Sequence, residues 1–259
     1  MVFLGSFQTL SVCKDAAGIA GNIFALGLFV SPAPTFRRII RNKSTEQFSG
    51  LPYIYALLNC LICAWYGSPL ISSDNLSVTT VNSAGAVFQI VYIILFILYA
   101  EKTKKVRMVG LLLAVFSLFA IIVLGSLLIV DLEVRHVTIG FLSCASLISM
   151  LASPLFIINL VIRTRSVEFM PYYLSLSTFL MSTSFLLYGI FSFDPFIYVP
   201  NGIGTILAII QLVLFSYYQN ASRENSRVPL LVSHDMMSGK GSVNSQTWTV
   251  IEEGRVSSS

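Results

Sequence analysis

Seven long apolar runs, separated by short polar segments, dominate the pattern of the chain. They cover approximately residues 16–36, 52–70, 78–100, 106–130, 137–162, 171–193 and 196–219. A helix that crosses the hydrocarbon core of a bilayer needs about 20 mostly apolar residues. Within lipid each run has to be helical, because a helix satisfies its own backbone hydrogen bonds. The pattern therefore predicts an all-α membrane protein with seven transmembrane helices.

The composition agrees with a membrane location. Hydrophobic residues make up 55% of the chain and charged residues only 11%, whereas a soluble domain carries roughly 25% charged residues. Lipid must therefore cover much of the surface. The N-terminus has neither a basic segment nor a small-residue cleavage site, so we expect the first run to be a retained helix rather than a signal peptide.

Lys and Arg residues gather on one side of the predicted topology. Fourteen of the sixteen lie in the loops after the first, third and fifth runs and in the tail, which leaves Lys14 and Arg135 for the other side. Because cytosolic loops carry an excess of Lys and Arg, we expect a cytosolic C-terminus and a lumenal or extracellular N-terminus. The tail over residues 220–259 is polar and Ser-rich, which predicts disorder.

Five short motifs recur in the same order about 120 residues further along the chain. The pairs are Ser31-Pro32 and Ser153-Pro154, Arg41-x-Lys43-Ser44-x-Glu46 and Arg163-x-Arg165-Ser166-x-Glu168, Pro52-Tyr53 and Pro171-Tyr172, Tyr66-Gly67 and Tyr188-Gly189, and Asn82-x-x-Gly85 and Asn201-x-x-Gly204. Runs one to three and five to seven are therefore copies, and the fourth run has no partner.

The unpaired crossing brings the second copy into the membrane in the same orientation as the first. We therefore predict two parallel three-helix bundles, residues 1–105 and 137–219, joined by a linker helix within residues 106–136. Two such bundles facing each other form a natural central cavity with alternating access.

Ionisable side chains are absent from the interior of all seven runs. The pattern thus lacks the carboxylate relay of a proton-coupled carrier, the lysine of a retinal protein and the histidine of an intramembrane serine protease. Only His136 and His234 are present, and Cys60 and Cys63 form a C-x-x-C inside an apolar run, so we expect no metal, no cofactor and no enzyme activity. These absences favour a passive facilitator for a neutral, hydroxyl-rich solute.

Asn82 and Asn201 are the strongest candidates for binding such a solute. An amide offers hydrogen-bond donors and an acceptor without charge. The repeat places the two residues opposite each other across the axis that relates the two copies. The alternative is that they only hold helices together. For Asn59, Asn159 and Gln211 the choice between solute binding and a structural role is more ambiguous, and a structural role is favoured for the first two. Asn75-Leu76-Ser77 is a glycosylation sequon that we expect to be unused, since it lies close to the membrane.

Four prolines, paired by the repeat, lie at the predicted cytosolic end. Pro32 and Pro154 fall late in the first and fifth runs, and Pro52 and Pro171 open the second and sixth. Proline removes a backbone donor and weakens a helix. Pro52 and Pro171 also fit ordinary helix starts, but the four together predict the hinge of an inner gate.

Several stretches of the chain resemble the plant SWEET (MtN3/saliva) sugar transporters over residues 15–219. They are Gly21-Asn22, Ser31-Pro32, residues 43–50, Trp65-Tyr66-Gly67, Ala152-Ser153-Pro154, residues 166–171 and Pro200-Asn201-Gly202. The resemblance implies a bidirectional sugar uniporter that works by alternating access without ion coupling. It also implies homo-oligomers, possible trimers among them, and no nucleic-acid partner. The beginning of the chain is most similar to the vacuolar branch of that family.

The resemblance also implies roles for individual residues. Asn82 and Asn201 match the family's sugar-binding asparagines, and Cys63 and Phe185 match positions above and below the sugar. The bulk of Phe185 implies a monosaccharide such as glucose. The resemblance further assigns the outer gate to Tyr66 with Asp194 and the inner gate to Pro32, Pro52, Pro154 and Pro171.

Two other functions stay open at this point. A PQ-loop amino-acid exporter has a similar architecture, but it should show Pro-Gln dipeptides, and this chain has none. A seven-helix receptor has no need for repeated asparagines and hinge prolines, and it would bind its ligand without transporting it.

Overall fold

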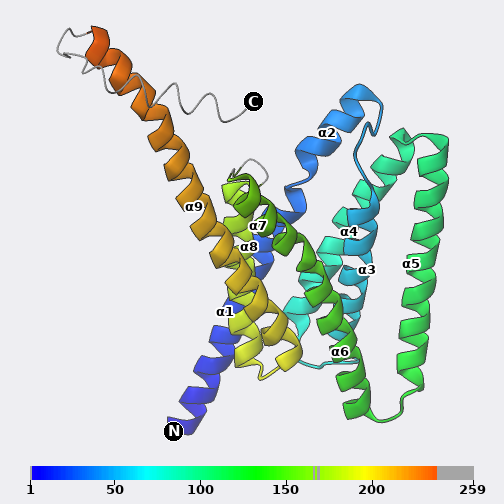
Figure 1. Cartoon of the computed structure of the whole chain (residues 1–259). Coiled ribbons are helices and arrows are strands. Elements are labelled where there is room, and N and C mark those ends of the chain that lie inside the picture. The colour runs from blue at the N-terminus through cyan, green and yellow to red at the C-terminus, as the bar shows by residue number, and fades with distance from the viewer. Residues whose placement is uncertain (1, 166, 168–169, 238–259) are drawn as a thin grey trace. The chain divides into compact units, whose positions relative to one another are not determined.

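The computed structural model describes residues 2–165, 167 and 170–237, and these residues are almost entirely helical. Over the described residues the helices are α1 (Val2–Val30), α2 (Ala33–Asn42), α3 (Leu51–Tyr66), α4 (Leu76–Tyr99), α5 (Lys102–Leu128), α6 (Leu132–Met150), α7 (Ala152–Thr164), α8 (Tyr172–Phe191) and α9 (Pro195–Met237) (Figure 1). The chain divides into two compact units, Met1–Phe215 and Ser216–Ser259. The helix packing and the cavity lie within the first unit.

The helices correspond to the seven predicted crossings. Helices α1 and α2 together form the first crossing, and α6 and α7 form the fifth. In the described residues, six segments are long and apolar enough to cross a membrane, and α3 is a shorter apolar helix of 16 residues. The prediction of an all-α, seven-helix membrane protein is confirmed.

Both divided crossings break beside a proline of the repeat. Pro32 caps α2, and the amide of Ser31 turns back to the Leu28 carbonyl. The second break falls at Leu151, three residues before Pro154. Because proline has no backbone N–H, the helical ladder loses a hydrogen bond at each site. Two of the four prolines singled out in the sequence, Pro32 and Pro154, therefore lie near interruptions within a crossing.

Helix packing can be described along the two copies of the repeat, here called the first and second halves. In the first half, α4 packs against α1, α2 and α3. In the second half, a Cβ on Gly189 would collide with the backbone of Tyr198, and one on Gly204 would press on Ser182, so α8 and α9 lie close together. The halves meet where α1 contacts α8 and where α3 contacts α6, and α5 packs against α3, α4 and α6.

This unit has two ends that differ in the connections they hold. Helix α2 and the α4–α5 connection lie at one end, and the α5–α6 connection lies at the other (Figure 1). We call the first the proline end, because it holds the α1–α2 break with Pro32. The second is the Asp194 end.

Large apolar side chains remain exposed along the helices, most clearly on α5. Its Leu113, Ile121 and Leu124 are each more than 60% exposed. Hydrocarbon rather than water is the solvent that suits such a surface. The exposed apolar surface therefore agrees with a chain embedded in a bilayer.

Helix α9 extends further than the sequence predicted. Residues 220–237 are helical, so over this range the structure differs from the disordered tail expected from Asn220. An existing helix adds residues without repeating the costly nucleation step, and Ala, Arg and Glu are good helix formers. The rest of the predicted disordered segment, residues 238–259, lies outside the described residues.

Candidate functional site

A cavity of about 410 Å³ lies between the two halves. Helices α1, α3, α4, α6, α7, α8 and α9 all contribute to its wall, and its volume is within the usual range of small-molecule sites. Most of the wall is apolar, with a small number of uncharged polar side chains. Asn82, Asn201, Cys63 and Phe185, the residues that the sequence assigned to solute binding, all line this one cavity.

Asn82 and Asn201 have the same local geometry. The Nδ2 of Asn82 donates to the carbonyl of Val78 at 2.9 Å, and the Nδ2 of Asn201 donates to that of Ile197 at 2.8 Å. Each bond stays within its own helix, which does not support the alternative that these amides hold helices together. The bond uses one N–H, so each amide keeps its carbonyl oxygen and its second N–H for a solute.

Cys63 and Phe185 occupy equivalent positions in the repeat but differ greatly in size. A Cβ on Gly21 of α1 would lie 2.7 Å from the ring of Phe185, so only glycine leaves room for that ring. In the other half, the hydroxyl of Ser143 donates to the Cys63 sulfur at 3.3 Å. Gly21 and Ser143 are themselves repeat equivalents. The large side chain thus meets a glycine and the small one meets a serine.

Sequence reasoning missed a polar contribution from α3 and α6. Asn59, for which a structural role was favoured, lines the cavity, and its Oδ1 accepts a hydrogen bond from Ser146 at 2.9 Å. Asn59 therefore both joins the two halves and lines the cavity. Asn59 lies four residues before Cys63, and this spacing, which places both on one helix face, is a signal that could have found it.

Gln89 is a second cavity residue that the sequence did not single out. It lines the cavity two turns after Asn82 on α4. Its Oε1 is buried and has no hydrogen-bond partner among the described residues. A buried amide oxygen without a partner is costly, so it is available to a hydroxyl donor.

Polar contacts join the two halves at the Asp194 end. The Tyr66 hydroxyl donates to Asp194 Oδ2 at 2.5 Å, as the predicted pair requires, and the Asn75 amide donates to the same oxygen at 2.7 Å. His136 Nε2 lies 3.0 Å from the Tyr66 oxygen. Because the phenol proton goes to Asp194, the histidine acts as the donor here. Asn75 and His136 were not predicted as members of this cluster.

The repeat supplies a second bridge at the same end. Tyr188, the counterpart of Tyr66, donates its hydroxyl to the carbonyl of Asp74 at 2.9 Å. Lys14, the counterpart of His136, donates to the same carbonyl at 3.3 Å and lies over the Tyr188 ring. Each half therefore contributes a tyrosine that is hydrogen-bonded to the other half, and both tyrosines are about 1% exposed. These contacts join the two halves at the Asp194 end.

The proline end of the cavity differs from the Asp194 end in the residues that form it. The cavity wall reaches Ser153 and Pro154 at the start of α7. Pro32, Pro52 and Pro171 lie at helix starts outside the lining that the described residues form. The halves still touch here, because the Tyr55 hydroxyl is hydrogen-bonded to Ser149. The structure thus places the four prolines at helix junctions, and one of them directly on the cavity.

The comparisons with known proteins agree with this architecture. Residues 15–104 and 137–223, one segment in each half, match the family described as sugar efflux transporters for intercellular exchange. Bidirectional sugar transporter SWEET2 of Arabidopsis thaliana is 67% identical over 87% of this chain and 96% of its own length. Bidirectional sugar transporter SWEET2a of Oryza sativa subsp. indica is 60% identical over 86% and 91% of the two chains.

A solved structure of a similar protein has the same fold as this chain. A eukaryotic SWEET transporter superposes with a TM-score of 0.81 at 54% sequence identity, and the match covers 82% of this chain and 99% of the other. The amino-acid exporter and receptor alternatives find no support in these comparisons. The family match, the high identity and the shared fold together show that this chain belongs to the SWEET family of transporters.

Proposed function

We propose that this protein is a bidirectional sugar uniporter that moves a monosaccharide such as glucose by alternating access. The observation that carries the proposal is the cavity between the halves, where both copies of the repeat contribute an asparagine with a free amide edge. The hydroxyls of a sugar donate and accept hydrogen bonds, which matches these uncharged groups. The printed names of the similar plant proteins, which are bidirectional sugar transporters, support the same substrate class.

The proposed roles follow the geometry. Asn82 and Asn201 bind the sugar, with Cys63 and Phe185 bounding the space around it. Tyr66 and Asp194 form the outer gate, which is closed here by their 2.5 Å hydrogen bond. Transport requires these contacts to open and the inner gate, at Pro32, Pro52, Pro154 and Pro171, to close around the other end of the cavity.

Transport needs no coupled ion in this proposal. Among the described residues that line the cavity, there is no Asp, Glu, Lys, Arg or His. A coupled carrier uses such groups to bind its ion beside the substrate. The sugar gradient alone therefore sets the direction of net flux.

The membrane, orientation and assembly are further parts of the proposal. The placement of the Lys and Arg residues supports a cytosolic proline end and a lumenal or extracellular Asp194 end. The similarity of the beginning of the chain to the vacuolar branch supports the vacuolar membrane. The membership of the SWEET family supports a homo-oligomer.

Uptake into proteoliposomes tests the central proposal. Purified protein is reconstituted without any ion gradient, and labelled glucose, 2-deoxyglucose and sucrose are offered separately. We expect equilibrating monosaccharide uptake that unlabelled glucose competes away and that a protonophore leaves unchanged. Empty liposomes are the control. The absence of any sugar uptake by demonstrably folded protein would contradict the function, and dependence on a proton gradient would contradict uniport.

A further inference from the structure

Helices α2 and α7 are repeat equivalents, and each lies directly after a break at the proline end. Both end in the same way: Lys43 follows α2 and Arg165 follows α7, each in the left-handed conformation with φ near 50°. Motion of these two short helices about their breaks is the simplest way to open or close this end of the cavity. Their surroundings, however, differ.

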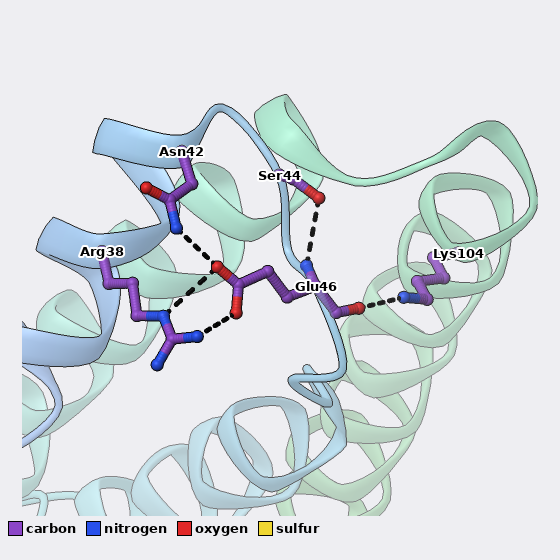
Figure 2. A network of polar contacts seen from close by, with 5 residues as sticks. All are labelled: Arg38, Asn42, Ser44, Glu46 and Lys104. Carbon is purple, nitrogen blue, oxygen red and sulfur yellow. Dashed lines mark hydrogen bonds and ion pairs between the residues drawn. The ribbon is translucent and has the colours of Figure 1, made fainter.

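A carboxylate in the loop after α2 holds that helix in place. Arg38 donates to Glu46 through Nε at 3.2 Å and through a second nitrogen at 2.6 Å, and Asn42 donates to Glu46 at 2.6 Å (Figure 2). Two donors of one guanidinium on one carboxylate fix direction as well as distance. Both donors lie on α2, and the acceptor lies outside it.

The same loop is attached to the linker helix. Lys104 of α5 donates to the backbone carbonyl of Glu46 at 2.7 Å, and the Ser44 hydroxyl accepts from the Glu46 amide at 3.1 Å (Figure 2). Glu46 itself has a φ of 46°, so the loop turns sharply at the residue that all these groups contact. We name Arg38, Asn42, Glu46 and Lys104 the α2 brace.

The opposite face of α2 is buried. Phe36 and Ile39 are 2% and 1% exposed, and the ring of Phe36 stacks on that of Tyr92 with centroids 4.6 Å apart. Tyr92 also donates its hydroxyl to the Phe29 carbonyl at 2.7 Å, beside the break before α2. Helix α2 is thus held from both sides, by the brace and by packing on α4.

In the described residues of the second half, the two positions equivalent to Arg38 and Asn42 hold different side chains. Leu160 and Thr164 occupy the positions that Arg38 and Asn42 have in the first copy. The Thr164 hydroxyl donates to the Leu160 carbonyl of its own helix at 2.9 Å. Leucine offers no side-chain donor at all. The linker helix that contributes Lys104 also follows only the first half, because its crossing has no copy.

We propose that the two halves share the inner gate unequally: the brace keeps α2 fixed to α4 and α5, and α7 is the element that moves. The inference rests on the proposed transport function and assigns a positioning role to Arg38, Asn42, Glu46 and Lys104. The hinge at Pro154, which lines the cavity, then does most of the gating, while the break at Pro32 keeps its angle.

Spin-label distances within each half test this directly. Arg41 and Val87 in the first half correspond to Arg163 and Ile206 in the second, and all four side chains are exposed. Each pair is replaced by cysteine and labelled in full-length protein in nanodiscs, with Cys13 and Cys144 changed to serine. Distances are recorded with and without glucose, and with and without Tyr66→Phe, which removes a contact at the Asp194 end.

We expect the Arg163–Ile206 distribution to shift by several ångströms or to become bimodal, while the Arg41–Val87 distribution stays narrow. Glu46→Gln or Arg38→Leu should broaden the Arg41–Val87 distribution, with a population change of up to about fivefold, the range of an exposed ion pair. The double exchange Arg38→Glu with Glu46→Arg should narrow it again.

Two results would overturn the proposal: an equal or larger change in the first half of the wild-type protein, or no change in either half. The wild-type comparison decides the matter even if a brace variant fails to fold. Glucose uptake by the same labelled proteins is measured in parallel in proteoliposomes. Failed uptake would count against the transport function, whereas the distances report on the brace separately.

Discussion

At the scale of single residues, the two cavity asparagines are set up by identical local bonds. Each amide donates to the carbonyl four residues earlier, which fixes the orientation of the side chain before any solute arrives. Pre-oriented donors and acceptors bind without losing further side-chain freedom. The free edges of Asn82 and Asn201 should therefore account for much of the affinity for a polyol.

Replacement of Asn201 by alanine should reduce glucose flux by about 10-fold or more, because a site that loses hydrogen bonds to substrate loses about 1–3 kcal/mol. Flux is measured as labelled glucose exchange in proteoliposomes at equal protein content. Asn159→Ala, which changes an exposed asparagine on α7, is the matched control and should retain normal flux. Normal exchange by a well-folded Asn201→Ala protein would remove Asn201 from the binding site.

The close approach of Gly21 to Phe185 gives a second residue-scale prediction. A Cβ at Gly21 would lie 2.7 Å from the Phe185 ring, so Gly21→Ala should push the ring away from α1. Overpacking of this kind costs about 1–3 kcal/mol, and we expect slower glucose exchange. Phe185→Leu added to Gly21→Ala should restore part of the rate.

Gly110→Ala is the control for this pair, because a Cβ there meets nothing within 4 Å. Glucose exchange and thermal unfolding are measured for the wild type, Gly21→Ala, Gly21→Ala with Phe185→Leu, and Gly110→Ala. If Gly21→Ala transports as the wild type does, or if Phe185→Leu fails to rescue a slowed Gly21→Ala protein, the proposed contact does not shape the cavity.

At the scale of helices, the breaks before α2 and α7 set the geometry of the proline end. Pro32→Ala restores the backbone donor that proline lacks, so the α1–α2 break should straighten and move α2 out of its position at the proline end. We expect a lower rate of glucose exchange with little change in apparent affinity, because the cavity asparagines are untouched. The kinetic constants of zero-trans uptake check this.

Pro34→Ala supplies the comparison, since Pro34 lies in the first turn of α2, where no backbone donor is needed. It should transport at the wild-type rate. An equal loss of rate in both variants would point to general destabilisation rather than to the break.

The brace on α2 has a defined dependence on pH. Hydrogen bonds from Arg38 and then Asn42 lower the pKa of Glu46 below its ordinary value of 4.5. A group with a lowered folded-state pKa contributes stability above its unfolded pKa and loses it as the pH falls through the folded value. Arg38 and Lys104 are the charged side chains in contact with Glu46.

We therefore expect the Arg41–Val87 spin-label distribution to be the same at about pH 7.5 and about pH 5.5, with broadening only below the ordinary pKa of a glutamate. The Glu46→Gln protein should be broad at every pH. A distribution that broadens in the wild type already near pH 6 would mean that another titrating group controls α2.

At the scale of the whole molecule, the distribution of basic residues predicts one orientation in the bilayer. Protease cleavage sites placed before Val2 and after the last residue should behave differently in sealed vesicles of known sidedness. We expect cleavage from the cytosolic face only at the C-terminal site. Detergent-opened vesicles, in which both sites should be cut, are the control, and N-terminal cleavage in sealed vesicles would reverse the proposed orientation.

The whole-molecule picture also depends on how the two copies differ. The repeat predicts a symmetric pair of bundles, and the tyrosine bridges at the Asp194 end come close to that symmetry. The proline end departs from it, because Arg38 and Asn42 of the first copy are replaced by Leu160 and Thr164 in the second, and only the first copy is followed by the linker helix. Unequal halves are therefore compatible with a cavity that both copies build in nearly the same way.

The sequence alone determined the crossings, the repeat, the paired prolines and the cavity asparagines. Membrane spans are encoded in runs of apolar residues that need no knowledge of contacts, and the repeat lets one half predict the other. Asn82 and Asn201 could be found for this reason: both copies keep them inside apolar helices, where an amide is rare without a function.

Only the tertiary structure decided which side chains meet across the halves. Asn59 with Ser146, Gly21 with Phe185, and Asn75 and His136 at the Tyr66–Asp194 bond are contacts between helices far apart in the chain. The spacing along the chain between the two partners of each contact carries no signal, because the helix packing fixes which faces touch. The Arg38–Glu46 pair was visible only as loop charges, and its geometry became defined when Lys104 and the φ of Glu46 fixed the turn.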